Sequence, residues 1–255
     1  MNWMKEDFED LDNPATFAVD PSGMYGWIER MCDHLDDGAK KYLGKIIPKK
    51  YFGDGINNVV VCGMGGSAIS GDFAFSAVRE IIPVPFKVVR GYIEPRLLNP
   101  ETLQIVISYS GNTEETIWCY EQGLSRGAKI VAIASGGELK NLAKRDGTPF
   151  VELPDDFLAP RLALGMMIPA ILGVLESAFD NINGLDELIR DAVDSLKLGL
   201  NGFARDLPYD NNFPKKLAHD IHGVFPVVIA SDLTLPVATR FQAQLNAVSY
   251  THLTL

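Results

Sequence analysis

Short apolar runs alternate with amphipathic stretches through the middle of the chain. The runs are rich in β-branched residues and bounded by Gly, Pro or Ser, which predicts strands at 58–62, 86–89, 103–107, 129–134 and 149–153. Helical periodicity lies between them, at 68–80, up to about 125, and up to 144. Each strand is a mainly apolar run rather than a regular alternation of apolar and polar positions, which indicates an α/β fold whose parallel sheet is covered on both faces.

The flanking segments have other patterns. Residues 1–20 carry no periodicity and are expected to form an irregular arm. The other predicted elements are a helix at 22–43, a long apolar helix at 160–179, a helix at 185–200, a break at 208–214, a helix at 215–222, a strand at 227–230 and a helix at 236–245. The last strand and helix repeat the start of the central unit. We therefore expect an N-terminal arm and helix (1–57), a first α/β domain (58–207) and the incomplete beginning of a second (208–255).

Composition restricts the classes of function. The 255-residue chain has a formal net charge of −10, which disfavours a general nucleic-acid-binding surface. The N-terminus is acidic and has no apolar core, so we expect no signal peptide. The longest apolar run is interrupted by Pro169 and is too short to span a bilayer. These features predict a cytoplasmic protein without membrane or nucleic-acid partners.

Cysteine and histidine spacing gives little support for metal chemistry. Cys32, Cys62 and Cys119 are far apart in the sequence, which predicts reduced thiols rather than disulfides or a zinc site. His219 and His222 could share a helix face, but no further ligand lies near them in the sequence. We therefore expect no metal.

A hydroxyl-rich loop follows the third predicted strand. It contains Ser108, Ser110 and Thr113 around a glycine, and Asn112 is a candidate helix N-cap with Glu115 at the third helical position. Main-chain amides, hydroxyls and the positive end of a helix dipole can hold a phosphate without Lys or Arg. These residue types are also ordinary turn and cap formers, and acidic residues at 114 and 115 disfavour an anion there.

A glycine-rich loop follows the first predicted strand. Its sequence, Gly63-Met64-Gly65-Gly66-Ser67-Ala68, is close to the dinucleotide-binding fingerprint. That fingerprint also needs an acidic residue at the end of the second strand, where this chain has Arg90. A dehydrogenase would also leave the hydroxyl-rich loop unexplained.

Together the two loops resemble those of the sugar isomerase (SIS) family. With Ser135-Gly136-Gly137, Pro160-Arg161 and the segment from Arg240 to Asn246, the chain is similar to the bifunctional phosphoglucose/phosphomannose isomerase branch. The resemblance implies a three-layer α/β/α sandwich with a five-stranded parallel sheet, followed by the start of a second SIS-like domain. It also implies a homodimer in the full-length protein and a role in carbohydrate metabolism, including glycolysis and gluconeogenesis.

The resemblance also implies roles for individual residues. Ser108, Ser110 and Thr113 would hold the 6-phosphate of a phosphorylated hexose, while Gly65, Gly66 and Ser67 would approach the sugar. Arg161 would stabilise a cis-enediolate during aldose–ketose isomerisation of glucose 6-phosphate or mannose 6-phosphate to fructose 6-phosphate. No metal or other cofactor is implied. The alternative for Arg161 is an ion pair at a helix start with Asp155 or Asp156.

The chain departs from the family pattern after Asn246. The family continues with a Glu, the proposed general base, whereas here Ala247 follows and the sequence ends at Leu255, with His252 in no matching context. From this we expect an incomplete second domain, weak phosphosugar binding and little turnover. The alternative function is a non-catalytic phosphosugar-binding module that senses or regulates. We also expect the apolar helices at 162–175 and 192–200 to be left exposed and to favour association.

Overall fold

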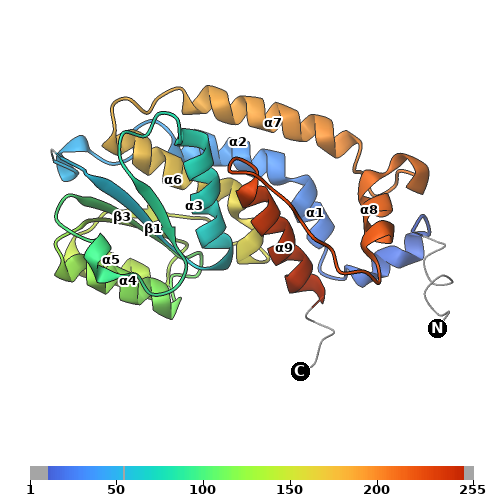
Figure 1. Cartoon of the computed structure of the whole chain (residues 1–255), viewed down its shortest axis with the longest axis horizontal. Coiled ribbons are helices and arrows are strands. Elements are labelled where there is room, and N and C mark those ends of the chain that lie inside the picture. Colours follow the sequence, from blue (N-terminus) through green and yellow to red (C-terminus); the bar gives the residue numbers. More distant parts are fainter. Residues whose placement is uncertain (1–10, 54, 250–255) are drawn as a thin grey trace.

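The central unit is an all-parallel five-stranded sheet. The structure, a computed structural model, describes residues 11–53 and 55–249, so the predictions for 1–10 and 250–255 lie outside it. The strands are β1 (Asn58–Cys62), β2 (Phe86–Val89), β3 (Thr102–Ile107), β4 (Lys129–Ala134) and β5 (Phe150–Glu152). Their order in the sheet is β2-β1-β3-β4-β5 (Figure 1). The predicted strands and parallel arrangement are confirmed.

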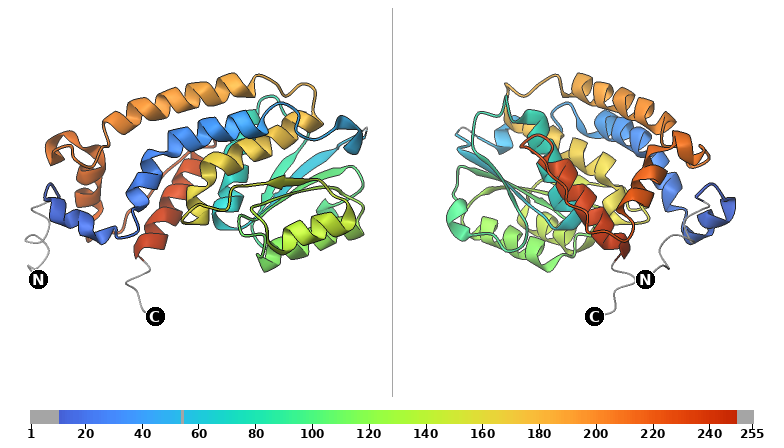
Figure 2. Two further views of the ribbon diagram at one scale, coloured as in Figure 1. Left: turned by 180° about the vertical axis from the view of Figure 1, so that it is seen from behind. Right: turned by 45° about the vertical axis from the view of Figure 1, so that its right-hand side comes forward.

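Helices cover both faces of this sheet. Helices α4 (Glu114–Ser125) and α5 (Gly137–Asp146) lie on one face, and α3 (Gly65–Val78) and α6 (Leu164–Ala178) lie on the other (Figures 1 and 2). The α3 and α6 side holds the larger core, which includes Ile105, Ile133 and Ile171, all fully buried. β3 is buried along its whole length, as expected for a parallel strand covered on both faces.

The strand register places the predicted binding loops at one edge. β1 pairs with both β2 and β3, so that Cys62 at its end lies opposite Val89 on one side and Val106 on the other. The connection from β2 to β3 carries the short 3-10 helix η3 (Pro95–Leu97). Because parallel strands end at the same edge, the loops after β1, β3 and β4 leave the sheet together.

The N-terminal part forms two helices where the sequence predicts one. A 3-10 helix, η1 (Pro14–Val19), lies in the expected irregular arm and is followed by α1 (Met24–Glu29) and α2 (Met31–Tyr42). The helix divides at Arg30, where ψ rises to 6°. A short 3-10 helix, η2 (Lys49–Tyr51), leads toward the sheet.

Helix α6 is buried, which corrects the expectation that the apolar stretch 162–175 is exposed. A 3-10 helix, η4 (Pro160–Leu162), precedes it, and α2 lies directly against it. The two helices approach closely through glycines: a Cβ on Gly173 would lie 1.8 Å from the Tyr42 carbonyl oxygen, and one on Gly38 would lie 2.5 Å from the Gly165 carbonyl oxygen. Helix α2 therefore covers the apolar surface of α6 that was expected to be exposed.

The C-terminal part is helical and partly exposed. It contains α7 (Leu185–Asn201), the 3-10 helix η5 (Tyr209–Asn211), α8 (Phe213–Ile221) and α9 (Leu235–Ser249). The outer helix α7 packs on α2. Leu198 on it is mostly exposed whereas Val193 is buried, so the exposure expected for 192–200 holds for only part of that stretch. The prediction of a strand at 227–230 is wrong: the segment is extended but pairs with no strand in the described structure.

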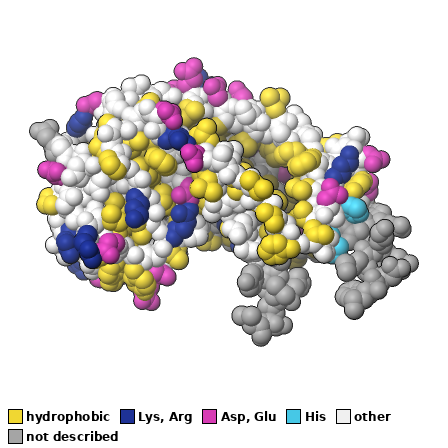
Figure 3. All heavy atoms as spheres, in the orientation of Figure 1, with side chains coloured by type: hydrophobic (Ala, Val, Ile, Leu, Met, Phe, Trp, Pro, Cys, Tyr) yellow, Lys and Arg dark blue, Asp and Glu magenta, His cyan; other side chains and the backbone are white. Residues whose placement is uncertain are grey.

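This extended segment presents apolar side chains to solvent. Phe225 is 92% exposed and Ile229 is 91% exposed. A groove of about 580 Å³ lies between the segment and α9, lined by Val224, Phe225 and Leu245 among others. Figure 3 shows hydrophobic side chains gathered over this part of the molecule.

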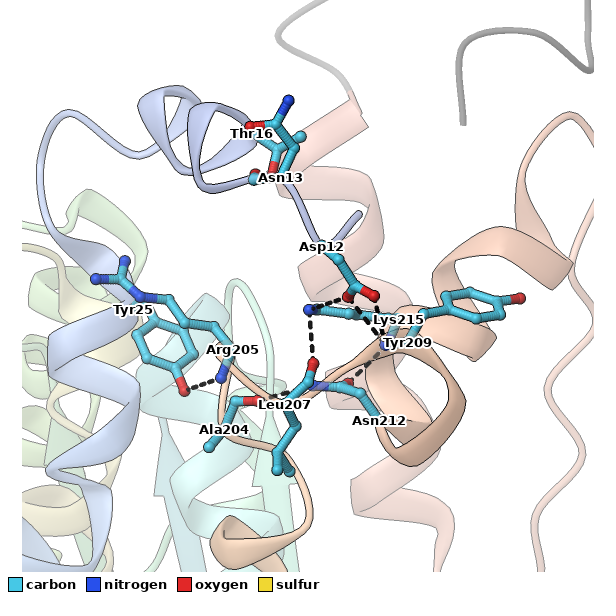
Figure 4. Close-up of polar contacts among 10 residues, drawn as sticks. All are labelled: Asp12, Asn13, Thr16, Tyr25, Ala204, Arg205, Leu207, Tyr209, Asn212 and Lys215. Atoms are coloured by element: carbon cyan, nitrogen blue, oxygen red, sulfur yellow. Dashed lines mark hydrogen bonds and ion pairs between the residues drawn. The ribbon is translucent and has the colours of Figure 1, made fainter. Parts of the chain in front are cut away.

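Polar contacts join the N-terminal arm and α1 to residues 204–215 (Figure 4). The Asp12 carboxylate accepts hydrogen bonds from the main-chain N–H of Tyr209, at 2.9 Å, and from the Lys215 ammonium, at 2.7 Å. The contact with Lys215 lowers the pKa of Asp12. The Tyr25 hydroxyl accepts a hydrogen bond from the Arg205 main-chain N–H, at 2.9 Å. These contacts fasten η5 and α8 to the N-terminal arm.

Three observations bear on composition. Cys32, Cys62 and Cys119 are free and buried, and the fold brings Cys62 beside Cys119. This contact and burial raise the pKa of Cys62. No helix within 11–53 or 55–249 is long and apolar enough to cross a membrane. Across the same residues, no group of three or more His, Cys, Asp and Glu side chains is arranged to hold a metal ion.

Candidate functional site

The loops after β3 and β4 pack against each other at the carboxyl edge of the sheet. Gly111 has φ = +70°, and a Cβ there would lie 1.9 Å from the Gly136 carbonyl oxygen. Gly137 also has φ = +70°, and its Cβ would lie 2.3 Å from the Ser110 carbonyl oxygen. Positive φ and contacts this short leave room only for glycine at both positions. Gly111 and Gly137 therefore allow the loops after β3 and β4 to pack closely and form one continuous surface.

The hydroxyl-rich loop is held in shape by its own side chains. Ser108 is 2% exposed, and its Oγ lies 2.9 Å from Thr113 Oγ1 and accepts a hydrogen bond from the Gly111 N–H at 3.1 Å. The exposed Ser110 Oγ accepts from the Asn112 N–H at 3.3 Å. The fold thus brings the three predicted hydroxyls together, with Ser108 at the base of the loop and Ser110 at its surface.

The helix cap after this loop differs from the prediction. Thr113 is the N-cap of α4 and makes no side-chain capping bond. Asn112, the expected cap, instead accepts a hydrogen bond from the Glu138 N–H at 2.9 Å and so fastens the loop to the start of α5. Local capping rules could not show this because the donor belongs to a different helix, α5. Glu114 reaches Tyr92, whose hydroxyl donates to its carboxylate at 2.8 Å.

The glycine-rich loop passes directly into α3, which begins at Gly65 rather than at the predicted Ala68. Gly65 adopts φ = +48°. Ser67 is buried in the first turn, where its hydroxyl accepts a hydrogen bond from the Tyr109 N–H at 3.3 Å and reaches the Met167 sulfur at 3.8 Å. Ser67 therefore couples the loop after β1 to the loop after β3.

Arg161 lies in η4, beside the glycine-rich loop. A Cβ on Gly66 would lie 3.2 Å from the Arg161 Cα, so the two segments are in close contact. The Arg161 Nε is buried and has no hydrogen-bond partner within the described residues. No ion pair joins Arg161 to Asp155 or Asp156 in the structure, which removes the main support for the alternative role as a paired helix-start residue.

Arg240 is a site residue for which the sequence suggested no role. It lies on α9, and its Nη2 donates a hydrogen bond to the Arg161 carbonyl oxygen at 3.1 Å. Burial, and next the charge of Arg161, lower the pKa of Arg240. The sequence signal was its place in the Arg240-to-Asn246 segment, but the contact spans 79 positions and needs the tertiary structure.

Two further residues support the loops from behind. Ser135 donates its hydroxyl hydrogen to the Tyr109 carbonyl oxygen at 2.7 Å, and the Tyr109 hydroxyl accepts a hydrogen bond from the Phe157 N–H at 3.1 Å. These contacts join the loops after β3, β4 and β5. The resulting edge combines hydroxyls, main-chain amides at two helix starts and two arginines, a set suited to an anionic, hydroxylated ligand.

Comparison with known proteins identifies the class. Residues 55–145 match the model of the SIS domain family. The C-terminal domain of glucosamine-fructose-6-phosphate aminotransferase from Francisella tularensis has a similar fold, with a TM-score of 0.64 and 14% identity over 90% of this chain and 68% of that one. The SIS-type α/β fold expected from the sequence is therefore confirmed.

The chain is related to the bifunctional phosphoglucose/phosphomannose isomerases. It is 33% identical over 210 residues to the protein of that name from Caldicellulosiruptor bescii, covering 80% of this chain and 60% of that protein. It is 35% identical over 189 residues to the one from Aquifex aeolicus, covering 74% of this chain and 54% of that protein. The alignments thus span little more than half the length of these relatives.

Proposed function

We propose that this chain binds a phosphorylated hexose at the carboxyl edge of β1 and β3 and belongs to an aldose–ketose isomerase. The reaction would interconvert glucose 6-phosphate or mannose 6-phosphate with fructose 6-phosphate through a cis-enediolate. The observation that carries this proposal is the meeting of the glycine-rich loop with Arg161, beside the hydroxyl cluster, in a chain related to phosphosugar isomerases.

The phosphate end of the ligand is assigned to the hydroxyl-rich loop. Ser110 is exposed there, while Ser108 and Thr113 support the loop from below. Neutral hydroxyls and amides at the start of α4 can hold a phosphate dianion without a cationic side chain. Because Glu114 is engaged by Tyr92, its carboxylate has a partner away from the loop.

The sugar end is assigned to the glycine-rich loop and Arg161. Gly65 and Gly66 carry no side chains, and Ser67 is held inward by its contacts, so the ring would approach the main chain closely. Removal of the C2 proton places negative charge on the C1 and C2 oxygens. The Arg161 guanidinium would stabilise that charge more than it stabilises the neutral sugar, and so lower the barrier.

A second candidate is a phosphosugar-binding module without turnover. It is favoured by the chemistry of the groups assigned above, which are hydroxyls, main chain and arginine and include no general base. In both cases the ligand is a phosphorylated hexose, and no metal or other cofactor is needed. A homodimer of the longer protein and a cytoplasmic role in hexose phosphate metabolism remain predictions that accompany the first candidate.

Calorimetric titration with fructose 6-phosphate tests the proposal. We expect Ser110→Ala and Arg161→Ala each to weaken binding about tenfold, since each removes a polar contact to a charged or polar ligand group. Ser125→Ala and Arg126→Ala, on the exposed end of α4, are matched controls and should bind as the unsubstituted chain does.

A coupled isomerase assay separates the two candidates. Turnover of fructose 6-phosphate that is lost in Arg161→Ala supports the enzyme, whereas binding without turnover supports the binding module. Absence of phosphosugar binding by the unsubstituted chain would reject both.

A further inference from the structure

Arg240 brings a second guanidinium to the Arg161 segment. Its helix, α9, packs against α3, whose first turn is made by the glycine-rich loop (Figure 1). From there Arg240 Nη2 donates to the main-chain carbonyl of Arg161 at 3.1 Å. The contact is to the main chain, so it holds the position of η4 whatever the Arg161 side chain does.

No carboxylate of the described residues forms an ion pair with either of these two arginines. The ion pairs formed within residues 11–53 and 55–249 include several arginines, such as Arg90 and Arg145, but neither Arg161 nor Arg240. Arg240 is partly buried, and the Nε of Arg161 is buried without a hydrogen-bond partner. Partly buried like charges without a counter-ion are costly, and an anion bound between them would relieve that cost.

The position of the pair indicates which part of a ligand it serves. Arg161 touches Gly66 in the loop after β1, whereas the hydroxyl cluster of Ser108 and Thr113 lies in the loop after β3. The arginines therefore lie toward the sugar end and not the phosphate end of the site described above.

We propose that Arg240 is a positioning residue that holds Arg161 and, with it, selects ligands that carry negative charge at C1 or C2. This inference rests on the proposed function. It assigns to the pair a preference for sugar phosphates whose C1–C2 end is anionic, as it is in an enediolate or an aldonate, over those whose end is neutral.

Two sugar phosphates that differ at C1 test the inference. 6-Phosphogluconate has a carboxylate at C1, and sorbitol 6-phosphate has a neutral hydroxyl there, while both keep the 6-phosphate. We expect the unsubstituted chain to bind 6-phosphogluconate more tightly. Arg240→Gln should reduce this preference about tenfold, as expected for losing a charged hydrogen-bond donor and its field, and change sorbitol 6-phosphate binding by less than about twofold.

Further variants separate positioning from folding. Arg240→Lys keeps the charge without the planar guanidinium, and we expect it to reduce the preference about threefold. Arg126→Gln is the control for surface charge and should leave the preference unchanged. Ser108→Ala should weaken both ligands equally because it acts at the phosphate end. If thermal denaturation shows that Arg240→Gln does not fold, the inference is tested instead by the ligand preference of Arg240→Lys.

The outcomes are distinguishable. If Arg240→Gln, or Arg240→Lys where that variant decides, keeps the preference of the unsubstituted chain unchanged, the inference is overturned and the proposed function stands. If Arg240→Gln weakens the binding of both ligands equally, the inference is also overturned, because Arg240 then has only a structural role. Failure of the unsubstituted chain to bind either phosphosugar overturns the proposed function and the inference together.

Discussion

Strand β1 and the segment 224–230 are built from similar residues and end in different structures. β1 is Asn-Val-Val-Val-Cys, and residues 227–230 are Val-Val-Ile-Ala. In β1 four of the five residues are buried, because β2 and β3 hydrogen-bond to either side and α3 covers one face. The later segment has no strand beside it in the described structure, and Val227 and Ile229 are mostly exposed.

The difference shows that an apolar β-branched run gives only a tendency to form a strand. Such a run becomes a strand when a neighbour satisfies its main-chain groups and another layer covers its side chains. Helices differ because their hydrogen bonds are internal. This is why α9 forms as predicted beside a segment that forms no strand.

The largest expected difference comes from the same substitution in the segment 224–230 and in β3, the buried strand paired with β1. Ile105 in β3 is fully buried, so Ile105→Ala should lower the free energy of unfolding by about 2–5 kcal/mol. Ile229 is 91% exposed, so Ile229→Ala should change it by less than about 0.5 kcal/mol. Urea denaturation of both variants measures the contrast. A loss above about 2 kcal/mol for Ile229→Ala would show that 224–230 is buried in solution and remove the contrast.

Substitution of Gly111 should lower stability less than Ile105→Ala does, but it should also weaken ligand binding. Gly111→Ala places a Cβ 1.9 Å from the Gly136 carbonyl oxygen in a backbone with φ = +70°. Relief of that contact requires the loops after β3 and β4 to separate. We expect about 1–3 kcal/mol lower unfolding free energy and at least about tenfold weaker fructose 6-phosphate binding.

The matched control for Gly111 is Gly26→Ala. Gly26 lies in α1, and a Cβ there meets nothing within 4 Å. Its alanine variant should keep both stability and binding, as measured by thermal denaturation and calorimetry. If Gly111→Ala binds the phosphosugar with unchanged affinity, the ligand does not bind at this loop.

Acidification should produce the smallest effect, and it again separates buried from exposed positions. His34 is buried beside Phe157 and Trp27, and burial, together with the charge of Arg30, lowers its pKa. Below an unfolded-state pKa of about 6.5 the unfolded chain binds a proton that the folded chain does not. Stability should therefore fall as the pH drops through this value, by at most about 1.4 kcal/mol per pH unit.

Urea denaturation between pH 7.5 and pH 5.5 measures this slope. His34→Gln should flatten it, because glutamine does not titrate. An equal slope in His34→Gln and in the unsubstituted chain would mean that other groups cause the acid sensitivity.

The sequence alone determined the local elements of this protein. Each strand, helix and loop motif is recognisable from residues that lie within a few positions of each other. These local patterns predicted the parallel sheet, the helices on both of its faces and the edge at which Ser108 and Gly66 lie. These elements form as expected because each one's pattern matches the burial it receives.

Tertiary structure decided what depends on distant partners. Asn112 binds Glu138 instead of capping its own helix, α6 is covered by α2, and Arg240 reaches the carbonyl of Arg161 from 79 positions away. Residues 227–230 remain unpaired because a strand needs a neighbour that no local pattern supplies. Hydrogen bonds and packing between distant segments cannot be derived from local preferences, because they depend on where the rest of the chain has folded.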